Sequence, residues 1–230
     1  MEIKNKIAIV TGASSGIGRA LSHELTKRGA TVVLAARSSD TLSALSAELP
    51  GSFAVPTDMT KLADIQNLIA QTQKKFGRVD LLVNNAGQGM RSAVEDIKMD
   101  DYRAIMELNV FGIVEAMQAV IPTMRAQGSG MILNISSMVS KNYYPLLAAY
   151  SSTKFALNSI SLTARQELAD DKIIVSVFHP KMTATDFGKN SRGEKYSSSA
   201  GRPGMTVDTP EEVALHIADQ IESEDAEANM

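Results

Sequence analysis

The feature that most constrains this chain is a regular alternation between short runs rich in β-branched residues and longer segments with helical spacing. In the segment after the first run, Ile17, Leu21 and Leu25 recur at the spacing of one helix face. Strands buried on both faces and joined by helices form a parallel sheet with helices above and below it. The pattern therefore predicts an α/β fold with a doubly wound parallel sheet. The runs predicted as strands span 6–12, 31–37, 52–58, 80–87, 130–136 and 173–180.

Size and composition indicate one domain, residues 1–230, because 230 residues with 44% hydrophobic content suit one well-filled core. The formal charge of -3 and the scattered lysines and arginines do not favour nucleic acid as a partner. The chain has no cysteine, and His23, His179 and His216 lie far apart, so we expect no metal site. We expect no membrane partner and a cytoplasmic location, because no run reaches the ~18 apolar residues of a membrane helix.

Two helical stretches, 101–126 and 150–169, carry more apolar residues than one sheet face should cover. Such helices are deeply buried or form contacts between subunits. We therefore expect a homodimer or homotetramer that associates through these two helices.

The segment 186–206 has Gly, Ser and charge without periodicity, and it is predicted to be a flexible substrate lid within the domain. A surface insertion is the alternative. The final residues, 226–230, are compatible with a short last strand or with a frayed end.

The octapeptide TGASSGIG follows the first predicted strand and opens a helix, which is the context of a dinucleotide-binding loop. Glycines in such a loop permit a tight turn, close approach of a pyrophosphate and close packing of helix on strand. The helix N-terminus adds N–H groups and a positive dipole end. The loop residues predicted to bind the cofactor are Gly12, Ser14, Ser15, Gly16, Ile17 and Gly18.

The end of the second predicted strand bears on the choice between NAD and NADP. Ala36 stands where an acidic residue would bind the ribose 2′-hydroxyl, and Arg37 follows it. A 2′-phosphate could then lie against Arg37, which favours NADP(H) while leaving NAD(H) possible. A solvated arginine is the alternative. Asp58, at the end of the third predicted strand, could bind the adenine amino group or cap the following helix.

The second half of the chain adds NNAG at 84–87, Asn109 within a predicted helix, ISS at 135–137 and YSSTK at 150–154. Together with the glycine loop, these motifs resemble the short-chain dehydrogenase/reductase family from about residue 6 to residue 185. Ser137 precedes Tyr150 by thirteen positions, as the corresponding serine does in that family. The resemblance implies a seven-stranded sheet, NAD(P) binding and a Ser-Tyr-Lys site with an accessory asparagine.

Tyr150 and Lys154 share one helix face, with Cβ atoms ~5–6 Å apart. A free tyrosine has a pKa of about 10, so proton exchange at neutral pH requires a lower pKa. We expect Lys154, in a partly dry site, to lower it and to hold the nicotinamide ribose, and Tyr150 to be the proton donor for reduction. Ser137 is expected to bind the substrate carbonyl at the carboxyl end of its strand, with Ser136 as the rival.

The remaining assignments rest more heavily on the resemblance. Asn109 is a poor helix former, so we expect a hydrogen-bonding duty for it. The resemblance implies a proton relay from Lys154, and a structural asparagine is the alternative. The family uses the 84–87 motif along the adenosine ribose, although it could be a strand-terminating turn. The cofactor-binding residues predicted beyond the glycine loop are Arg37, Asp58, Met59, Asn84, Ala86, Gly87, Tyr150, Lys154, Pro180, Thr183 and Thr185.

One departure from the family pattern follows the sixth predicted strand, where Lys181 stands in the position of the usual glycine. Lysine resists positive φ, so the turn beneath the nicotinamide could differ. Thr185 occupies the position expected to contact the carboxamide. Alternatively, Thr183 or Thr185 caps a short lid helix.

These observations predict an NADP(H)-preferring oxidoreductase that transfers a hydride between the nicotinamide and a carbonyl or secondary alcohol. An NAD-dependent alcohol dehydrogenase and a non-catalytic dinucleotide-binding sensor are the alternatives. We expect a small-molecule substrate, and the candidate pocket residues are mostly apolar or aromatic. They are Gln88, Met90, Val139, Tyr143, Tyr144 and Met182.

Overall fold

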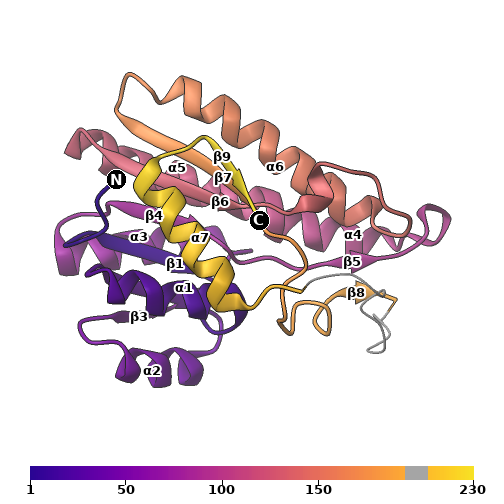
Figure 1. Ribbon diagram of the computed structural model, residues 1–230, viewed down its shortest axis with the longest axis horizontal. Coiled ribbons are helices and arrows are strands. Elements are labelled where there is room, and N and C mark those ends of the chain that lie inside the picture. The colour runs from indigo at the N-terminus through magenta and orange to yellow at the C-terminus, as the bar shows by residue number, and fades with distance from the viewer. Residues whose placement is uncertain (195–206) are drawn as a thin grey trace.

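A seven-stranded parallel sheet runs through the centre of the molecule in the order β3-β2-β1-β4-β6-β7-β9 (Figure 1). The computed structural model describes residues 1–194 and 207–230. The predicted doubly wound α/β fold is confirmed. The strands are β1 (Ile7–Thr11), β2 (Thr31–Ala36), β3 (Phe53–Pro56), β4 (Leu81–Asn84), β6 (Gly130–Ile135), β7 (Ile173–His179) and β9 (Glu227–Asn229).

Helices cover both faces of the sheet. On one face lie α1 (Gly16–Lys27), α2 (Ser39–Glu48) and α7 (Pro210–Ser223), and α1 and α7 lie side by side next to β1 in Figure 1. On the other lie α3 (Leu62–Phe76), α5 (Gly112–Gln127) and α6 (Ala148–Glu167). Alternate side chains of β1 enter the two cores, since Ala8 and Val10 pack with the first set and Ile7 and Ile9 with the second. This double burial explains why the strands are apolar without interruption.

The strand order reverses direction at β1, because β2 lies on one side of it and β4 on the other. In open α/β sheets the crevice outside the carboxyl ends of the strands at such a point is where ligands bind. The loops after β1, β4, β6 and β7 therefore decide what this fold can do.

The first of the two long apolar stretches forms one continuous helical segment, Met99–Gln127, composed of α4 (Met99–Met106), a π-helical turn η2 (Glu107–Phe111) and α5. By length and composition this segment could cross a membrane, with a mean hydropathy of 1.5. Its buried face lies in the sheet-covering core, as expected of the central helix of a globular domain. Phe111 and Phe155 remain 50% and 37% exposed on η2 and α6.

The C-terminal residues form the strand β9, which pairs with β7, so the short-strand alternative for the tail is confirmed. Of the predicted lid at 186–206, residues 195–206 lie outside the described residues. The preceding residues include β8 (Arg192–Gly193), which pairs with β5 (Met90–Arg91) in a second small sheet. Short 3₁₀ turns η1 (Val94–Asp96) and η3 (Met138–Ser140) complete the described elements.

Candidate active site

The loop between β1 and α1 has the geometry that a pyrophosphate requires. Gly12 has a φ of +66°, and a Cβ there would lie 2.9 Å from Asn85 Nδ2. A Cβ on Gly18 would overlap the carbonyl oxygen of Gly12. The N-cap residue Ser15 makes no side-chain bond to the first turn of α1, and that turn contains no acidic residue. Its N–H groups and dipole thus face the crevice without a competing carboxylate, which fits an anionic diphosphate.

The turn after β4 is bound to this loop through Thr11. The Thr11 hydroxyl accepts hydrogen bonds from the N–H groups of Asn85 and Ala86, both at 3.0 Å. Asn85 Nδ2 donates to the Thr11 carbonyl at 2.9 Å. Asn84, which the sequence selected, is 1% exposed, and its side chain bonds Asn134 within the sheet at 2.8 Å. Only its backbone is available to a cofactor. Asn85, which the sequence analysis did not select, is the asparagine whose side chain bonds the glycine loop. Alternation along the strand separates the two asparagines onto opposite sides.

The loops after β2 and β3 form the side of the crevice expected for the adenosine. Arg37 is exposed just beyond β2. The Asp58 carboxylate accepts from the N–H and hydroxyl of Thr60, at 3.0 and 2.8 Å, instead of capping α3. Burial acts to raise the pKa of Asp58, but the Thr60 hydrogen bonds and the charges of Lys61 and Arg37 outweigh it and lower that pKa. Met59 is 5% exposed and packs in the core, so only its backbone faces the crevice.

Lys154 lies buried beside Tyr150 on α6. Its side chain is 4% exposed, its Nζ donates to the Ile135 carbonyl at 2.9 Å, and the same Nζ lies 6.0 Å from the Tyr150 ring centroid. Desolvation lowers the pKa of Lys154 to about 8. Tyr150 is 8% exposed, and Met90, Ile105 and other apolar residues pack around it. The partly dry site that the sequence required for this pair is therefore present.

The two serines after β6 have different surroundings. Ser136 is 3% exposed, and its hydroxyl donates to Asn158 Oδ1 at 2.6 Å. Ser137 is half-buried in an extended conformation, and its hydroxyl accepts from Val139 N at 3.3 Å. The hydroxyl proton of Ser137 is thus not used in that bond. This difference favours Ser137 over Ser136 as the serine that can donate a hydrogen bond to a ligand.

Asn109 is fully buried in η2, the π-helical turn. Its Oδ1 accepts from Gln88 N at 2.9 Å, and its Nδ2 donates to the Gln88 carbonyl at 2.8 Å and to Thr153 Oγ1 at 3.2 Å. A Cβ on Gly87 would lie 3.2 Å from Asn109 Oδ1 and 3.8 Å from Lys154 Nζ. Asn109 Oδ1 and Lys154 Nζ therefore both lie next to Gly87. π-bulges are frequent at functional sites, and this one places Asn109 against the turn after β4.

The segment after β7 accommodates the unusual lysine without strain. Among the described residues the non-glycine positions with left-handed φ are Asn5, Leu146, Lys172 and Glu224, so Lys181 has an ordinary conformation. The Pro180 carbonyl accepts from Met138 N at 3.1 Å. The chain then passes the glycine loop, where a Cβ on Gly16 would lie 3.0 Å from Thr185 Cγ2.

The two threonines of this segment form local turns. Thr183 Oγ1 donates to the Lys181 carbonyl at 3.0 Å, and Thr185 Oγ1 accepts from Phe187 N at 3.3 Å. The described residues 181–194 form turns and β8. Neither threonine therefore caps a short lid helix within this part of the chain. The helix that follows, α7, is capped by Thr209.

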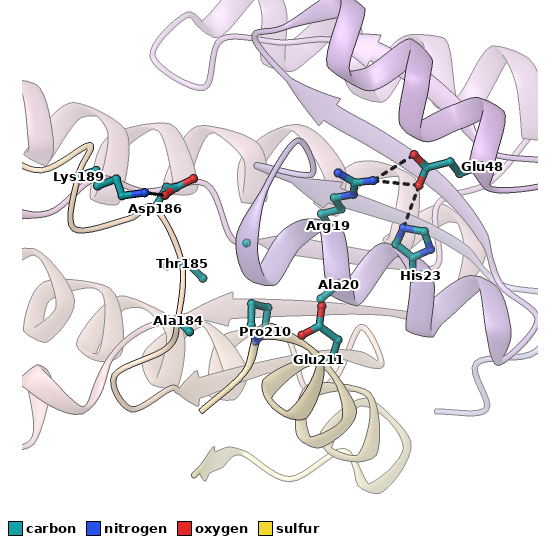
Figure 2. Close-up of a pocket in the computed structure, with 11 residues that line it drawn as sticks. Arg19, Ala20, His23, Glu48, Ala184, Thr185, Asp186, Lys189, Pro210 and Glu211 are labelled. Carbon is teal, nitrogen blue, oxygen red and sulfur yellow. Dashed lines mark hydrogen bonds and ion pairs between the residues drawn. The ribbon is translucent and has the colours of Figure 1, made fainter. Parts of the chain in front are cut away.

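An open cavity of about 820 Å³ lies beside the glycine loop, on the α1 and α7 side (Figure 2). Figure 2 shows Arg19 and His23 turned toward Glu48 on one side of this cavity. The two contacts with the Glu48 carboxylate are 3.0 and 3.4 Å. Because Gly16 and Thr185 line its rim, it joins the crevice at the end expected for phosphate. Tyr150 and Lys154 are not part of its wall.

The described part of the predicted lid is docked over Tyr150. The Phe187 ring centroid lies 5.7 Å from that of Tyr150, and β8 pairs with β5. Arg192 Nε donates to Gln88 Oε1 at 2.8 Å, and Arg192 Nη1 donates to Asp101 Oδ1 at 2.7 Å. Gln88 thus links residues 186–194 to Asn109, which bonds its backbone.

Comparison with known proteins agrees with this geometry. The sequence matches the short chain dehydrogenase family over residues 6–195. The chain belongs to this family. An uncharacterized oxidoreductase of Methylorubrum extorquens is 37% identical over 214 residues, with 91% of this chain and 84% of the relative covered. An uncharacterized oxidoreductase of Staphylococcus aureus is 36% identical over 185 residues, covering 80% of each chain.

Solved structures show the same architecture over nearly the whole chain. A 3-ketoacyl-(acyl-carrier-protein) reductase from Brucella melitensis, complexed with NADH, has a TM-score of 0.90 at 28% identity and covers 99% of this chain and 97% of its own. An alcohol dehydrogenase from the archaeon Thermococcus sibiricus, complexed with 5-hydroxy-NADP, has a TM-score of 0.87 at 26% identity, with 99% and 96% covered. This short-chain dehydrogenase is therefore an NAD(P)-dependent oxidoreductase that acts on a small molecule.

Proposed function

We propose that the enzyme is an NADP(H)-preferring carbonyl reductase or alcohol dehydrogenase in which Tyr150 exchanges the proton with the substrate oxygen. The observation that carries this proposal is the burial of Lys154 beside Tyr150. An exposed ion pair contributes only ~0–1 kcal/mol, whereas a desolvated ammonium exerts a much larger effect on a neighbouring phenol. Lys154 is thus suited to stabilise the phenolate of Tyr150.

The bound cofactor supplies the hydride that reduces the carbonyl carbon. Ser137 donates a hydrogen bond to the carbonyl oxygen and holds it toward Tyr150. The Tyr150 hydroxyl gives its proton to that oxygen as negative charge develops there, and Lys154 stabilises the phenolate that remains. In the oxidative direction the same groups act in reverse, with the phenolate as base.

Proton return to Tyr150 is proposed to pass by Lys154 and Asn109. Gly87 leaves space between the lysine Nζ and the asparagine Oδ1, as its missing Cβ shows. Asn109 is held by both backbone groups of Gln88, so its orientation is determined. A water in that space would have polar partners on both sides, as a buried water requires.

The preference for NADP(H) rests on Arg37 and its neighbours. Arg37 is exposed at the end of β2, and Ala36 leaves no carboxylate beside it at the ribose position. Ser38, the N-cap of α2, follows directly, so an arginine and a helix N-terminus lie together where a 2′-phosphate would sit. The nearby Asp58 carboxylate accepts two bonds from Thr60 and is turned to its own loop.

We propose an apolar carbonyl compound as the substrate and residues 186–194 as the described part of a lid over it. Met90, Val139 and Phe187 are among the apolar side chains that pack around Tyr150. Exposed Phe111 and Phe155 support a homodimer or homotetramer that associates through α4, α5 and α6. A cytoplasmic location is part of the same proposal.

The experiment that tests this function is NADPH oxidation by the purified protein with a panel of aldehydes, ketones, diketones and quinones. Tyr150→Phe should abolish turnover while NADPH binding, measured by fluorescence, persists. Tyr102→Phe is the matched control, because it also removes one hydroxyl near Tyr150, and that hydroxyl only bonds Ser152 at 2.8 Å. Turnover that survives in Tyr150→Phe would contradict the proposed role of Tyr150. Tight NADPH binding without turnover of any compound would favour a dinucleotide sensor.

A further inference from the structure

A buried histidine at the end of β7 has no part in the chemistry proposed above. His179 is fully buried, and its two ring nitrogens meet partners from different elements. Nε2 lies 2.9 Å from Glu227 Oε1 on β9, and Nδ1 lies 3.3 Å from Ser140 Oγ in η3. The histidine therefore connects the C-terminal strand to the turn that follows β6.

The partners determine the tautomer of this ring. A carboxylate can only accept, so the Glu227 contact places a proton on Nε2 of His179. Burial lowers the pKa of His179, and the charge of Lys141, whose Nζ bonds the same carboxylate oxygen at 2.6 Å, lowers it further. Glu227 and the backbone of Ser137 act to raise that pKa but do not outweigh burial. The ring is then neutral, and its unprotonated Nδ1 packs against the Ser140 side chain at 3.3 Å without sharing a proton, because the Ser140 hydroxyl donates to the Ser137 carbonyl.

The Ser140 hydroxyl lies between His179 and the backbone of Ser137. Its Oγ is 2.6 Å from the Ser137 carbonyl oxygen, to which it donates, and 3.3 Å from Nδ1. Asn158 Nδ2 donates to the same Oγ at 2.9 Å, so the hydroxyl cannot turn toward Asn158. The Ser137 carbonyl is thus bonded to Ser140, and His179, held by Glu227, packs against the Ser140 side chain.

We propose that His179 and Glu227 are positioning residues that hold Ser137, through Ser140, in the orientation needed to bind the substrate oxygen. This inference rests on the proposed function of Ser137. A group that stabilises developing charge must be held within about 0.5 Å of its working position, and the supporting residues provide that accuracy. The last strand of the chain would then contribute to catalysis although none of its residues touches the substrate.

The test compares Glu227→Ala with a matched variant, Glu222→Ala. Both glutamates lie in the C-terminal segment and form ion pairs, and their side chains are 36% exposed in Glu227 and 47% exposed in Glu222. Glu222 pairs with Arg28 and does not contact His179 or Ser140. Glu227→Gln is the conservative variant, because the amide oxygen of glutamine can still accept a hydrogen bond from His179 Nε2.

We expect Glu227→Ala to lower kcat about 10-fold, the loss of roughly one hydrogen bond's contribution in the transition state. The dissociation constant for NADPH should stay within twofold of wild type. The deuterium isotope effect on kcat with 4-deuterated NADPH should rise, because the chemical step becomes slower. Glu227→Gln should recover most of the rate, and Glu222→Ala should match wild type. Hydrogen exchange measured by mass spectrometry should show faster exchange of residues 136–141 in Glu227→Ala only.

Unchanged exchange of residues 136–141 in Glu227→Ala overturns the inference, whether or not a substrate has been found. An unchanged kcat also overturns it, and so does a kcat that falls only in proportion to the folded fraction measured by circular dichroism. Absence of turnover in the wild type contradicts the proposed function instead, and the exchange experiment then still decides whether Glu227 orders the turn.

Discussion

Lys154→Met gives the sharpest test of the buried lysine beside Tyr150, because methionine keeps much of the side-chain length and removes the charge together with the Nζ bond to the Ile135 carbonyl. An ammonium 6.0 Å from the tyrosine ring, at an effective dielectric constant of about 20, interacts with a phenolate by about 3 kcal/mol. That energy corresponds to about two pKa units of Tyr150. We therefore expect kcat for reduction at pH 7 to fall about 100-fold, and the alkaline limb for alcohol oxidation to move up by about two pH units.

The same substitution is expected to lower activity without lowering stability at pH 7. The pKa of Lys154 is lowered from 10.5 to about 8, so the unfolded chain binds more protons than the folded chain between these values. In the wild-type protein without cofactor, this group makes the free energy of unfolding rise with pH from about 8 to 10.5, by about 3 kcal/mol in total. Lys154→Met should lack this rise, and at pH 7 it should be at least as stable as wild type.

The assays are steady-state rates across pH and urea unfolding at pH 7 and 10. A loss of activity accompanied by an equal loss of folded protein would refute the reasoning, because Lys154 would then be a structural residue. An unchanged pH profile for oxidation would also refute it, since the charge would have no effect on Tyr150.

Three further substitutions test other parts of the proposal. Arg37→Asp should reverse the NADPH preference to NADH, with a change of roughly 10-fold or more in the kcat/KM ratio, and an unchanged ratio would exclude Arg37 from the 2′-phosphate site. Arg192→Gln should raise KM for the carbonyl substrate several-fold by breaking the bonds to Gln88 and Asp101, with NADPH binding unaffected, and an unchanged KM would argue against a lid. Phe111→Asp should dissociate the oligomer in sedimentation velocity, and a wild-type monomer would contradict the assembly itself.

Local sequence patterns were sufficient to predict most of the candidate site. The glycine loop, the Tyr150 and Lys154 pair on one helix face, and Ser137 after a strand all depend on spacing within a few residues. Local patterns did not indicate how the Asn84 and Asn85 side chains would be oriented. Both asparagines of the pair suit a strand end, but the packing of β4 against β6 turns Asn84 inward and leaves Asn85 to bind Thr11.

The sequence pattern did not predict the π-helical turn. Asn109 was recognised as a poor helix former, but the widened turn at Glu107–Phe111 that brings it to Gln88 was not predicted. π-turns are rare, so helix propensity alone predicts a continuous helix there. The docking of residues 186–194 was missed for a related reason, because Arg192 and Gln88 are 104 positions apart.

The sequence by itself determined the fold class and the family, and it predicted the residues that bind a dinucleotide or move a proton, because these inferences depend on periodicity and on short motifs. Only the tertiary structure decided which groups are dry, which asparagine faces the loop and how His179 and Glu227 meet behind Ser137. Burial and hydrogen bonding between distant segments depend on how the strands are ordered in the sheet. The pKa of Lys154 is a property of that packing, since the ammonium is desolvated only when α6 closes over the carboxyl end of β6.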